Sequence, residues 1–321
     1  MTLSVHLAHR PEPEDRRRLC DALAPEIELT LGPEGPTPAR YQILVAGRPS
    51  REDLTASPHL DTLVIPWSGL PEETRKLMLD FPQIAVHNLH HNATPVAEMV
   101  VTLMLAAARQ IVPADRALRG HDWRPRYRPT PALLMAGRTS LILGYGAVGR
   151  KVGHICRALG MRVLAIRRRP EGEADVYPPT ALHRLLPQAD ALLVCLPHTP
   201  ETDGLVGARE LALLPRDAVL VNVGRGAIVD QGALYRALRE GDLFAAGLDV
   251  WYNYPADADA RAHTPPADHP FHELDNVVMS PHRAGGTTST GALRMQHLAA
   301  LLNTAARGEP LPNPVDVEAG Y

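Results

Sequence analysis

A G-x-G-x-x-G sequence near the middle of the chain constrains the fold more than any other feature. The glycines Gly144, Gly146 and Gly149 follow the apolar run 141–143, open a helical pattern and precede a second apolar run, 161–166. This order predicts a strand, a tight turn, a helix and a strand. In such a unit the first glycine makes the turn, the second lets the backbone approach a pyrophosphate, and the third lets the helix pack closely on the strand. Because the helix N-terminus also offers N–H groups to phosphates, the segment predicts dinucleotide binding.

Length and charge limit the other possibilities. A chain of 321 residues exceeds what one compact core usually carries, so we expect two domains. The net charge of −3 gives no electrostatic reason to expect binding to nucleic acid or to a membrane. We find no apolar signal segment and no run long enough to span a bilayer, so we expect a cytoplasmic protein. The three cysteines are scattered without metal-type spacing.

Strand and helix signals alternate along the rest of the chain, which predicts an α/β protein with parallel sheets. The expected strands are 3–8, 41–46, 62–65, 84–86, 191–196, 218–223, 244–248 and 277–280. The longest helix signal runs from Thr94 to Ile111, and Pro113 is expected to end it. The segment 121–131 is irregular and basic, and we interpret it as a surface connector. A last helix is expected over 292–306.

Polar residues follow the carboxyl ends of the late predicted strands. Pro197 follows the strand 191–196, Arg225 lies in a glycine-flanked turn, Asp249 ends the next strand and His282 follows the last. In an open α/β sheet, ligands bind outside the carboxyl ends of the strands. Each residue alone could be an ordinary loop residue, but together they predict a site beside the dinucleotide.

Several segments resemble the signature blocks of the D-isomer-specific 2-hydroxyacid dehydrogenases. They are LPHTPETDGLVG (196–207), NVGRGAIVD (222–230), AAGLDV (245–250) and SPHRAGGT (280–287), and 87–109 resembles the family's first interdomain helix. The resemblance covers about residues 65–287. It implies a Rossmann dinucleotide-binding domain (108–283) inserted into a smaller flavodoxin-like substrate domain (1–107 and 284–321). It also implies a homodimer.

The resemblance assigns roles to the substrate-facing residues. It implies hydride transfer between nicotinamide and C2 of a 2-keto or 2-hydroxy acid. Arg225 matches the arginine that holds the carboxylate, a task suited to its planar fork. His282 matches the acid/base, which works near neutral pH. The turn Ser68, Gly69 and Leu70 is similar to the family's substrate loop, whose backbone N–H groups bind the carboxylate.

The third catalytic position departs from the family. The family has a glutamate before a proline, which orients the histidine and raises its pKa, but Tyr254 stands at that position here. A neutral tyrosine orients without supplying charge, so we expect His282 to titrate nearer its ordinary pKa of about 6.5. Asp257, Asp259 or Asp268 could replace the carboxylate, although a solvated loop is the simpler interpretation.

The cofactor end departs as well. NAD-preferring members carry an acidic residue after the second strand, whereas this chain has Arg167, Arg168 and Arg169. Arginines suit a 2′-phosphate, so we expect NADP(H) to be preferred, with NAD(H) possible. Asp249 matches the aspartate that meets the nicotinamide carboxamide. The expected cofactor-binding residues are Gly144, Gly146, Ala147, Val148, Arg167, Arg168, Leu196, Pro197, Thr202, Val223, Gly224, Asp249, His282 and Ala284.

Two features leave alternatives open. His90 and His91 are adjacent, but no carboxylate or cysteine is spaced to help them, so we expect no metal site and assign them to the pocket border or to solvent. The predicted function is a glyoxylate/hydroxypyruvate-type reductase. Tyr254 leaves open a dinucleotide-binding sensor or regulatory protein with little turnover, or oxidation of an unusual small anion such as formate or phosphite.

Overall fold

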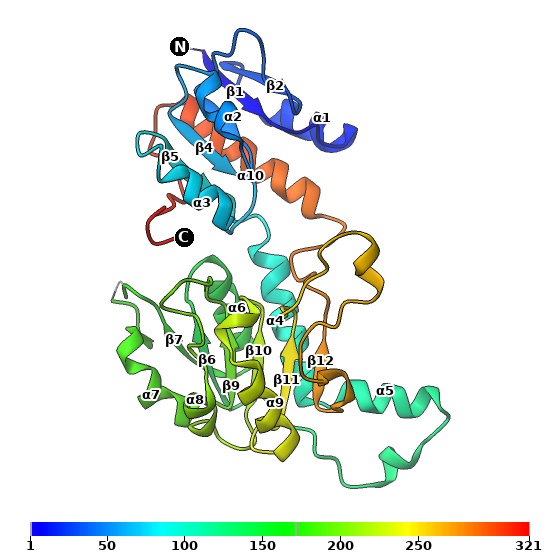
Figure 1. The fold of residues 1–321 in the computed structure, drawn as a ribbon. Helices are drawn as coiled ribbons and strands as arrows, with labels where there is room; N and C mark the ends of the chain where they lie inside the picture. The colour runs from blue at the N-terminus through cyan, green and yellow to red at the C-terminus, as the bar shows by residue number, and fades with distance from the viewer. Residues whose placement is uncertain (1, 171, 321) are drawn as a thin grey trace. The chain divides into compact units, whose positions relative to one another are not determined.

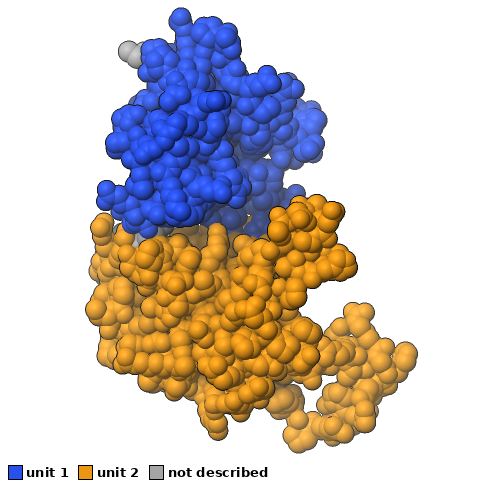
Figure 2. Space-filling model, viewed as in Figure 1, with its two compact units in different colours: residues 1–92, 285–321 blue, residues 93–284 orange. Residues whose placement is uncertain are grey.

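The computed structural model describes residues 2–170 and 172–320, and these divide into two compact units. Unit 1 comprises residues 1–92 and 285–321, and unit 2 comprises residues 93–284 (Figure 2). One unit is therefore inserted into the other in sequence. The division differs from the expected boundary after residue 107, because the helix 93–108 groups with unit 2.

Unit 1 is a parallel five-stranded sheet with the order β2-β1-β3-β4-β5 (Figure 1). Its strands are β1 (Leu3–Leu7), β2 (Ile27–Leu31), β3 (Ile43–Val45), β4 (Thr62–Ile65) and β5 (Ala85–Asn88). Its helices are α1 (Pro13–Ala22), α2 (Arg51–Ala56), α3 (Glu72–Met78) and α10 (Thr290–Ala306). Residues of α1 and α10 pack with Ile43 and Val45 on one face, while residues of α2 and α3 pack with Leu44 on the other. This order is that of the flavodoxin-like fold.

Unit 2 is a parallel seven-stranded sheet with the order β12-β11-β10-β9-β6-β7-β8. Its strands are β6 (Thr139–Leu143), β7 (Arg162–Ile166), β8 (Val176–Tyr177), β9 (Ala191–Val194), β10 (Val219–Asn222), β11 (Ala245–Leu248) and β12 (Val277–Met279). Its helices are α4 (Ala93–Ala108), α5 (Ile111–Arg119), α6 (Ala147–Ala158), α7 (Leu182–Leu185), α8 (Ala208–Ala212) and α9 (Gln231–Glu240). Residues of α4 and α6 cover one face, and residues of α7, α8 and α9 cover the other. Helices on both faces of a parallel sheet with this order make a Rossmann fold.

The predicted helix Thr94–Ile111 is broken in the structure. Helix α4 ends at Ala108, Gln110 takes a left-handed φ of 52°, and α5 begins at Ile111. Pro113 therefore does not end a helix; it lies in the first turn of α5, where its missing N–H has no partner to lose. Among the described residues, no single helix is long and apolar enough to span a membrane, although the bent pair of α4 and α5 passes on length and composition.

Candidate active site

The glycine turn has the geometry of a phosphate cradle. Gly144 follows β6 with a φ of +94°, which suits glycine, and Gly146 immediately precedes α6. A Cβ at Gly149 would lie 2.0 Å from the carbonyl oxygen of Gly144, so only glycine lets α6 start this close to the turn. A Cβ at Gly146 would meet no atom within 4 Å, so space remains in front of the helix N-terminus. Ala147 and Val148 form the first turn of α6, where N–H groups are available to a phosphate.

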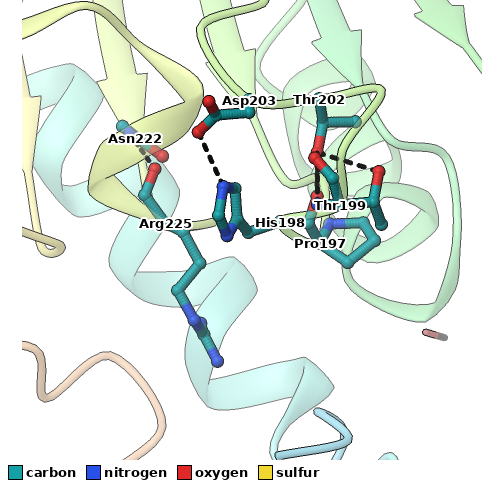
Figure 3. Close-up of polar contacts among 7 residues, drawn as sticks. All are labelled: Pro197, His198, Thr199, Thr202, Asp203, Asn222 and Arg225. Carbon is teal, nitrogen blue, oxygen red and sulfur yellow. Dashed lines mark hydrogen bonds and ion pairs between the residues drawn. The ribbon is translucent and has the colours of Figure 1, made fainter. Parts of the chain in front are cut away.

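The loop after β9 is held by Thr202. Its hydroxyl donates to the carbonyl of Pro197 at 2.8 Å and accepts from the backbone N–H of Thr199 at 2.8 Å (Figure 3). The same loop joins the glycine turn, because a Cβ at Gly144 would lie 2.8 Å from the carbonyl oxygen of Cys195. His198 points instead to the Asp203 carboxylate, at 2.8 Å. Thr202 and Pro197 are thus parts of one rigid loop.

The loop after β10 presents Arg225. Asn222 donates from Nδ2 to the carbonyl of Arg225 at 2.9 Å and accepts from the N–H of Gly224 at 3.0 Å, and the first contact is visible in Figure 3. Gly224 packs against the β9 loop, where a Cβ would lie 2.5 Å from the carbonyl oxygen of Leu196. The Arg225 side chain is exposed, and its Nη1 donates to the Gly224 carbonyl at 2.7 Å. Asn222 begins the NVGRGAIVD block but was not among the site residues expected from the sequence.

Asp249 is buried at the end of β11, and its carboxylate binds the loop that carries His282. It accepts from the Ser280 hydroxyl at 2.6 Å and from the backbone N–H groups of Arg283 and Ala284 at 3.0 and 2.9 Å. Asp249 therefore holds the loop that carries His282 in place. This role was not expected from the sequence. Its contact with a nicotinamide carboxamide stays a prediction.

His282 is held in a special conformation and bonded to Tyr254. Its φ is 52°, a left-handed value that few residues other than glycine adopt. The Tyr254 hydroxyl lies 2.8 Å from Nδ1 of His282 and accepts from the backbone N–H of Trp251 at 3.2 Å. This hydrogen bond leaves Nε2 of His282 as the ring nitrogen that is not engaged by Tyr254.

The electrostatics around His282 disfavour its charged form. The pKa of His282 lies below its ordinary value of 6.5, because partial burial of the ring and the positive charge of Arg225 outweigh the attraction of Asp249. Two of the aspartates in the following loop are bonded to other residues: Asp268 accepts from Asn253 and Gln231, and Asp257 accepts from the N–H of Ala260. Tyr254 is thus the side chain bonded to His282 at the position of the family's glutamate.

The arginines after β7 have an acidic neighbour that the sequence analysis did not weigh. The Glu173 carboxylate accepts hydrogen bonds from Nη1 and Nη2 of Arg150, at 2.6 and 2.7 Å. It also lies 3.6 Å from Nη1 of Arg167. The residues 167–169 become progressively more exposed, from a half-buried Arg167 to exposed Arg168 and Arg169. Part of the positive charge at this end of β7 is therefore balanced by Glu173.

The substrate loop predicted from the sequence belongs to unit 1. Ser68, Gly69 and Leu70 follow β4, and the Ser68 carbonyl accepts from Nδ2 of Asn88 at 2.8 Å. The loop therefore begins at the carboxyl end of the unit 1 sheet, where α/β proteins place ligands. Over the part of the chain that the structure describes, no group of three or more histidine, cysteine, aspartate or glutamate side chains is placed to hold a metal ion.

Comparison with known proteins identifies the family of the chain. The family described as "D-isomer specific 2-hydroxyacid dehydrogenase, NAD binding domain" matches residues 101–284. A glyoxylate reductase from Aeropyrum pernix is 41% identical over 231 residues, which cover 69% of this chain and 66% of that protein, just under two thirds of its length.

Solved structures give the same result over the whole chain. A D-isomer specific 2-hydroxyacid dehydrogenase from Xanthobacter autotrophicus, in complex with NADPH and MES, is 26% identical with a TM-score of 0.78 and covers 100% of this chain and 99% of that one. An NADPH-dependent glyoxylate/hydroxypyruvate reductase from Sinorhizobium meliloti is 25% identical with a TM-score of 0.73 and covers 98% of both chains. The resemblance found in the sequence is therefore confirmed, and the chain belongs to the D-isomer-specific 2-hydroxyacid dehydrogenase family.

Proposed function

We propose that this protein reduces small 2-keto acids to 2-hydroxy acids with a nicotinamide dinucleotide, as a glyoxylate/hydroxypyruvate-type reductase. The observation that carries the proposal is the grouping of Arg225, His282 and Tyr254 on one edge of the Rossmann sheet. The Arg225 loop adjoins the glycine turn through the close contacts of Gly144 and Gly224 with the β9 loop. The relatives named above support it, since one is called a glyoxylate reductase and another a glyoxylate/hydroxypyruvate reductase. Purified protein is expected to oxidise NADPH when glyoxylate or hydroxypyruvate is added.

Each group in this site has a distinct task. The dinucleotide supplies a hydride equivalent to C2 of the keto acid. Arg225 binds the substrate carboxylate and polarises the carbonyl, since a guanidinium donates two parallel hydrogen bonds. His282 donates a proton from Nε2 to the carbonyl oxygen, while Tyr254 accepts from Nδ1 and fixes the ring. We also propose that backbone N–H groups of the Ser68–Leu70 loop bind a substrate carboxylate.

The absence of a carboxylate partner sets the pH range of the proposed reaction. Proton donation needs the imidazolium form of His282, and its population falls as pH rises through the pKa. Since the pKa of His282 is lowered from 6.5, reduction is expected to slow already below neutrality.

The tyrosine at position 254 favours one alternative function, a dinucleotide-binding sensor with little turnover, because Tyr254 supplies no charge to the histidine. Oxidation of a small anion such as formate or phosphite is a further alternative within the same site.

We propose NADP(H) as the preferred cofactor because Arg167 and Arg168 directly follow β7. Replacing both with alanine is expected to raise the KM for NADPH about 10- to 100-fold and to change that for NADH much less, since a charged hydrogen bond is worth about 1.5–3 kcal/mol. Steady-state kinetics with both cofactors measures this. The matched control is Arg169→Ala, an exposed arginine in the same run. Equal losses for NADPH and NADH would remove the arginines from cofactor selection.

We propose that the protein is a homodimer and that α5 and the segment after it are covered by a second copy. Exposed apolar side chains gather there: Ile111 is 53% exposed, Trp123 60%, Tyr127 79% and Leu134 70%. Large exposed apolar side chains grouped in this way are typical of interfaces. Replacing Trp123 and Tyr127 with serine is expected to convert the dimer into a species of one chain, 34.9 kDa, measured by light scattering during gel filtration. A wild-type protein that already elutes as a single chain would contradict the proposal.

The proposed use of a reduced dinucleotide also suggests where in the cell the protein works. A reductase of this kind draws on the cell's pool of reduced dinucleotide, so we propose a cytoplasmic protein. Its proposed partners are a small keto acid and a second copy of the chain, with no role for nucleic acid, membrane or metal.

A further inference from the structure

A group of basic side chains lies in unit 1, and the proposed reaction does not use it. His9 follows β1, His90 and His91 follow β5, and Arg294 and His297 lie on α10. We call these five residues the histidine cluster. Nε of Arg294 lies 3.5 Å from Nε2 of His91, and the charge of Arg294 also lowers the pKa of His9. His9, His91 and Arg294 are therefore close neighbours drawn from three separate elements.

His91 has a buried donor with no partner. The residue is 3% exposed, and its Nε2 faces the Arg294 guanidinium, which can only donate. Nε2 is therefore the acceptor, and Nδ1 carries the proton. Among the described residues, Nδ1 of His91 is buried and meets no hydrogen-bond partner. Leaving a buried donor unsatisfied lowers the free energy of unfolding by about 1–3 kcal/mol. A ligand that supplies an acceptor to this N–H would recover that free energy.

The charge of the cluster suits one negative group. Burial, followed by the charges of Arg294, His297 and His90, lowers the pKa of His91 to about 4, and burial also lowers the pKa of His90 and of His9. At neutral pH these three imidazoles are neutral, and Arg294 carries a full positive charge. Asp15 of α1 lies against Gly291, one turn before Arg294 on α10, and within the described part of the chain no ion pair joins Asp15 to Arg294.

The cluster shares an edge of the sheet with the substrate loop. All strands of unit 1 run parallel, so the segments after β1, β4 and β5 meet at their carboxyl ends. The substrate loop Ser68–Leu70 follows β4, and Asn88 of β5 bonds to it directly through the Ser68 carbonyl. His90 comes two residues after Asn88 in the chain. A ligand held by this loop could therefore extend along the same edge to the cluster.

We propose that the histidine cluster is a carboxylate-binding subsite, so that among the 2-keto acids the enzyme reduces, those with a second carboxylate are preferred. This rests on the proposed function for the first carboxylate. Arg294 and Nδ1–H of His91 donate to the two oxygens of the second carboxylate, and the single positive charge of Arg294 balances it. A phosphate dianion would leave one negative charge unbalanced in a half-buried site.

The substrate arm of the test compares two keto acids of equal length, 2-oxoglutarate and 2-oxopentanoate. The wild-type enzyme is expected to have the higher kcat/KM with 2-oxoglutarate. Arg294→Gln is expected to lower that value about 10- to 100-fold and to change the value for 2-oxopentanoate by less than about threefold. The matched control is Arg307→Gln at the far end of α10, where the arginine pairs with Glu309. Equal losses for both substrates, or no preference in the wild type, would overturn the proposal.

The binding arm does not depend on turnover. Histidine ring ¹⁵N resonances of the full chain are followed while succinate or its neutral diamide is added, with inorganic phosphate as a third probe. Succinate is expected to shift the His91 ring signals and raise its pKa, the diamide to have no effect, and Arg294→Gln to abolish the shift. A response to phosphate alone, or no response, would contradict a carboxylate subsite. If succinate binds but no keto acid is reduced, the proposed function fails and the subsite stands.

Discussion

Replacing His282 with asparagine is expected to lower kcat for keto acid reduction about 10²- to 10⁴-fold, the usual contribution of a positioned general acid. Asparagine can keep a hydrogen bond with Tyr254 but cannot release a proton at neutral pH, and Asp257 and Asp268 of the neighbouring loop are bonded to other residues. The affinity for NADPH is expected to change little, because the glycine turn and the β9 loop do not depend on the ring. Steady-state kinetics and a fluorescence titration of NADPH measure the two quantities.

The matched control for this variant is His183→Asn. His183 lies on α7 with Nε2 2.8 Å from Glu210, so it is also a partly exposed histidine with one polar partner. It is remote in sequence and in the sheet from the loops that carry Arg225 and His282. Wild-type kcat in His282→Asn, or an equal loss in both variants, would remove His282 from proton transfer.

Two glycine-to-alanine variants are expected to separate cofactor binding from folding. Gly146→Ala should leave the thermal midpoint unchanged, because its Cβ meets no atom within 4 Å. It should nevertheless raise the Kd for NADPH about tenfold or more, since the methyl group occupies space next to the pyrophosphate position. Gly149→Ala should destabilise the protein by about 1–3 kcal/mol as well, because its Cβ would lie 2.0 Å from the Gly144 carbonyl oxygen and α6 must move.

Thermal unfolding and dinucleotide titration of the two variants measure this difference. Unchanged NADPH affinity in Gly146→Ala would show that the pyrophosphate does not lie at this turn. A stable Gly149→Ala protein with normal affinity would mean that the close approach of α6 to the turn is not needed.

Much of the site followed from local sequence patterns. The β6–α6–β7 unit was predicted because its glycines mark a turn that other residues cannot adopt, and the close contacts of Gly144 and Gly149 give the reason. Arg225 and His282 were expected at strand ends because buried parallel strands read as apolar runs with clear limits. Tyr254 was expected next to His282 from its position in the resemblance, and the two are hydrogen-bonded.

The parts that the sequence did not predict depend on tertiary contacts. Strand β8 has two residues, too few for a pattern, and β2 lies in a segment that is only half-buried. The side of the domain boundary on which α4 lies was missed, because an apolar helix does not reveal which sheet it covers. Leu103 of α4 packs on Gly247 of β11, where a Cβ would lie 2.7 Å from that of Leu103. The support of the His282 loop by Asp249 likewise joins residues more than thirty positions apart.

The rate of NADPH and NADH oxidation with glyoxylate, measured from pH 5 to 9, tests the central claim most directly. The wild-type enzyme is expected to reduce glyoxylate. As pH rises, the rate is expected to begin to fall below pH 6.5, because His282 loses its proton. Tyr254→Glu is expected to move this decline to higher pH, because a carboxylate beside Nδ1 stabilises the imidazolium. No oxidation with glyoxylate, hydroxypyruvate or longer keto acids at any pH, with NADPH still bound tightly, would contradict the reductase and favour the dinucleotide-binding sensor.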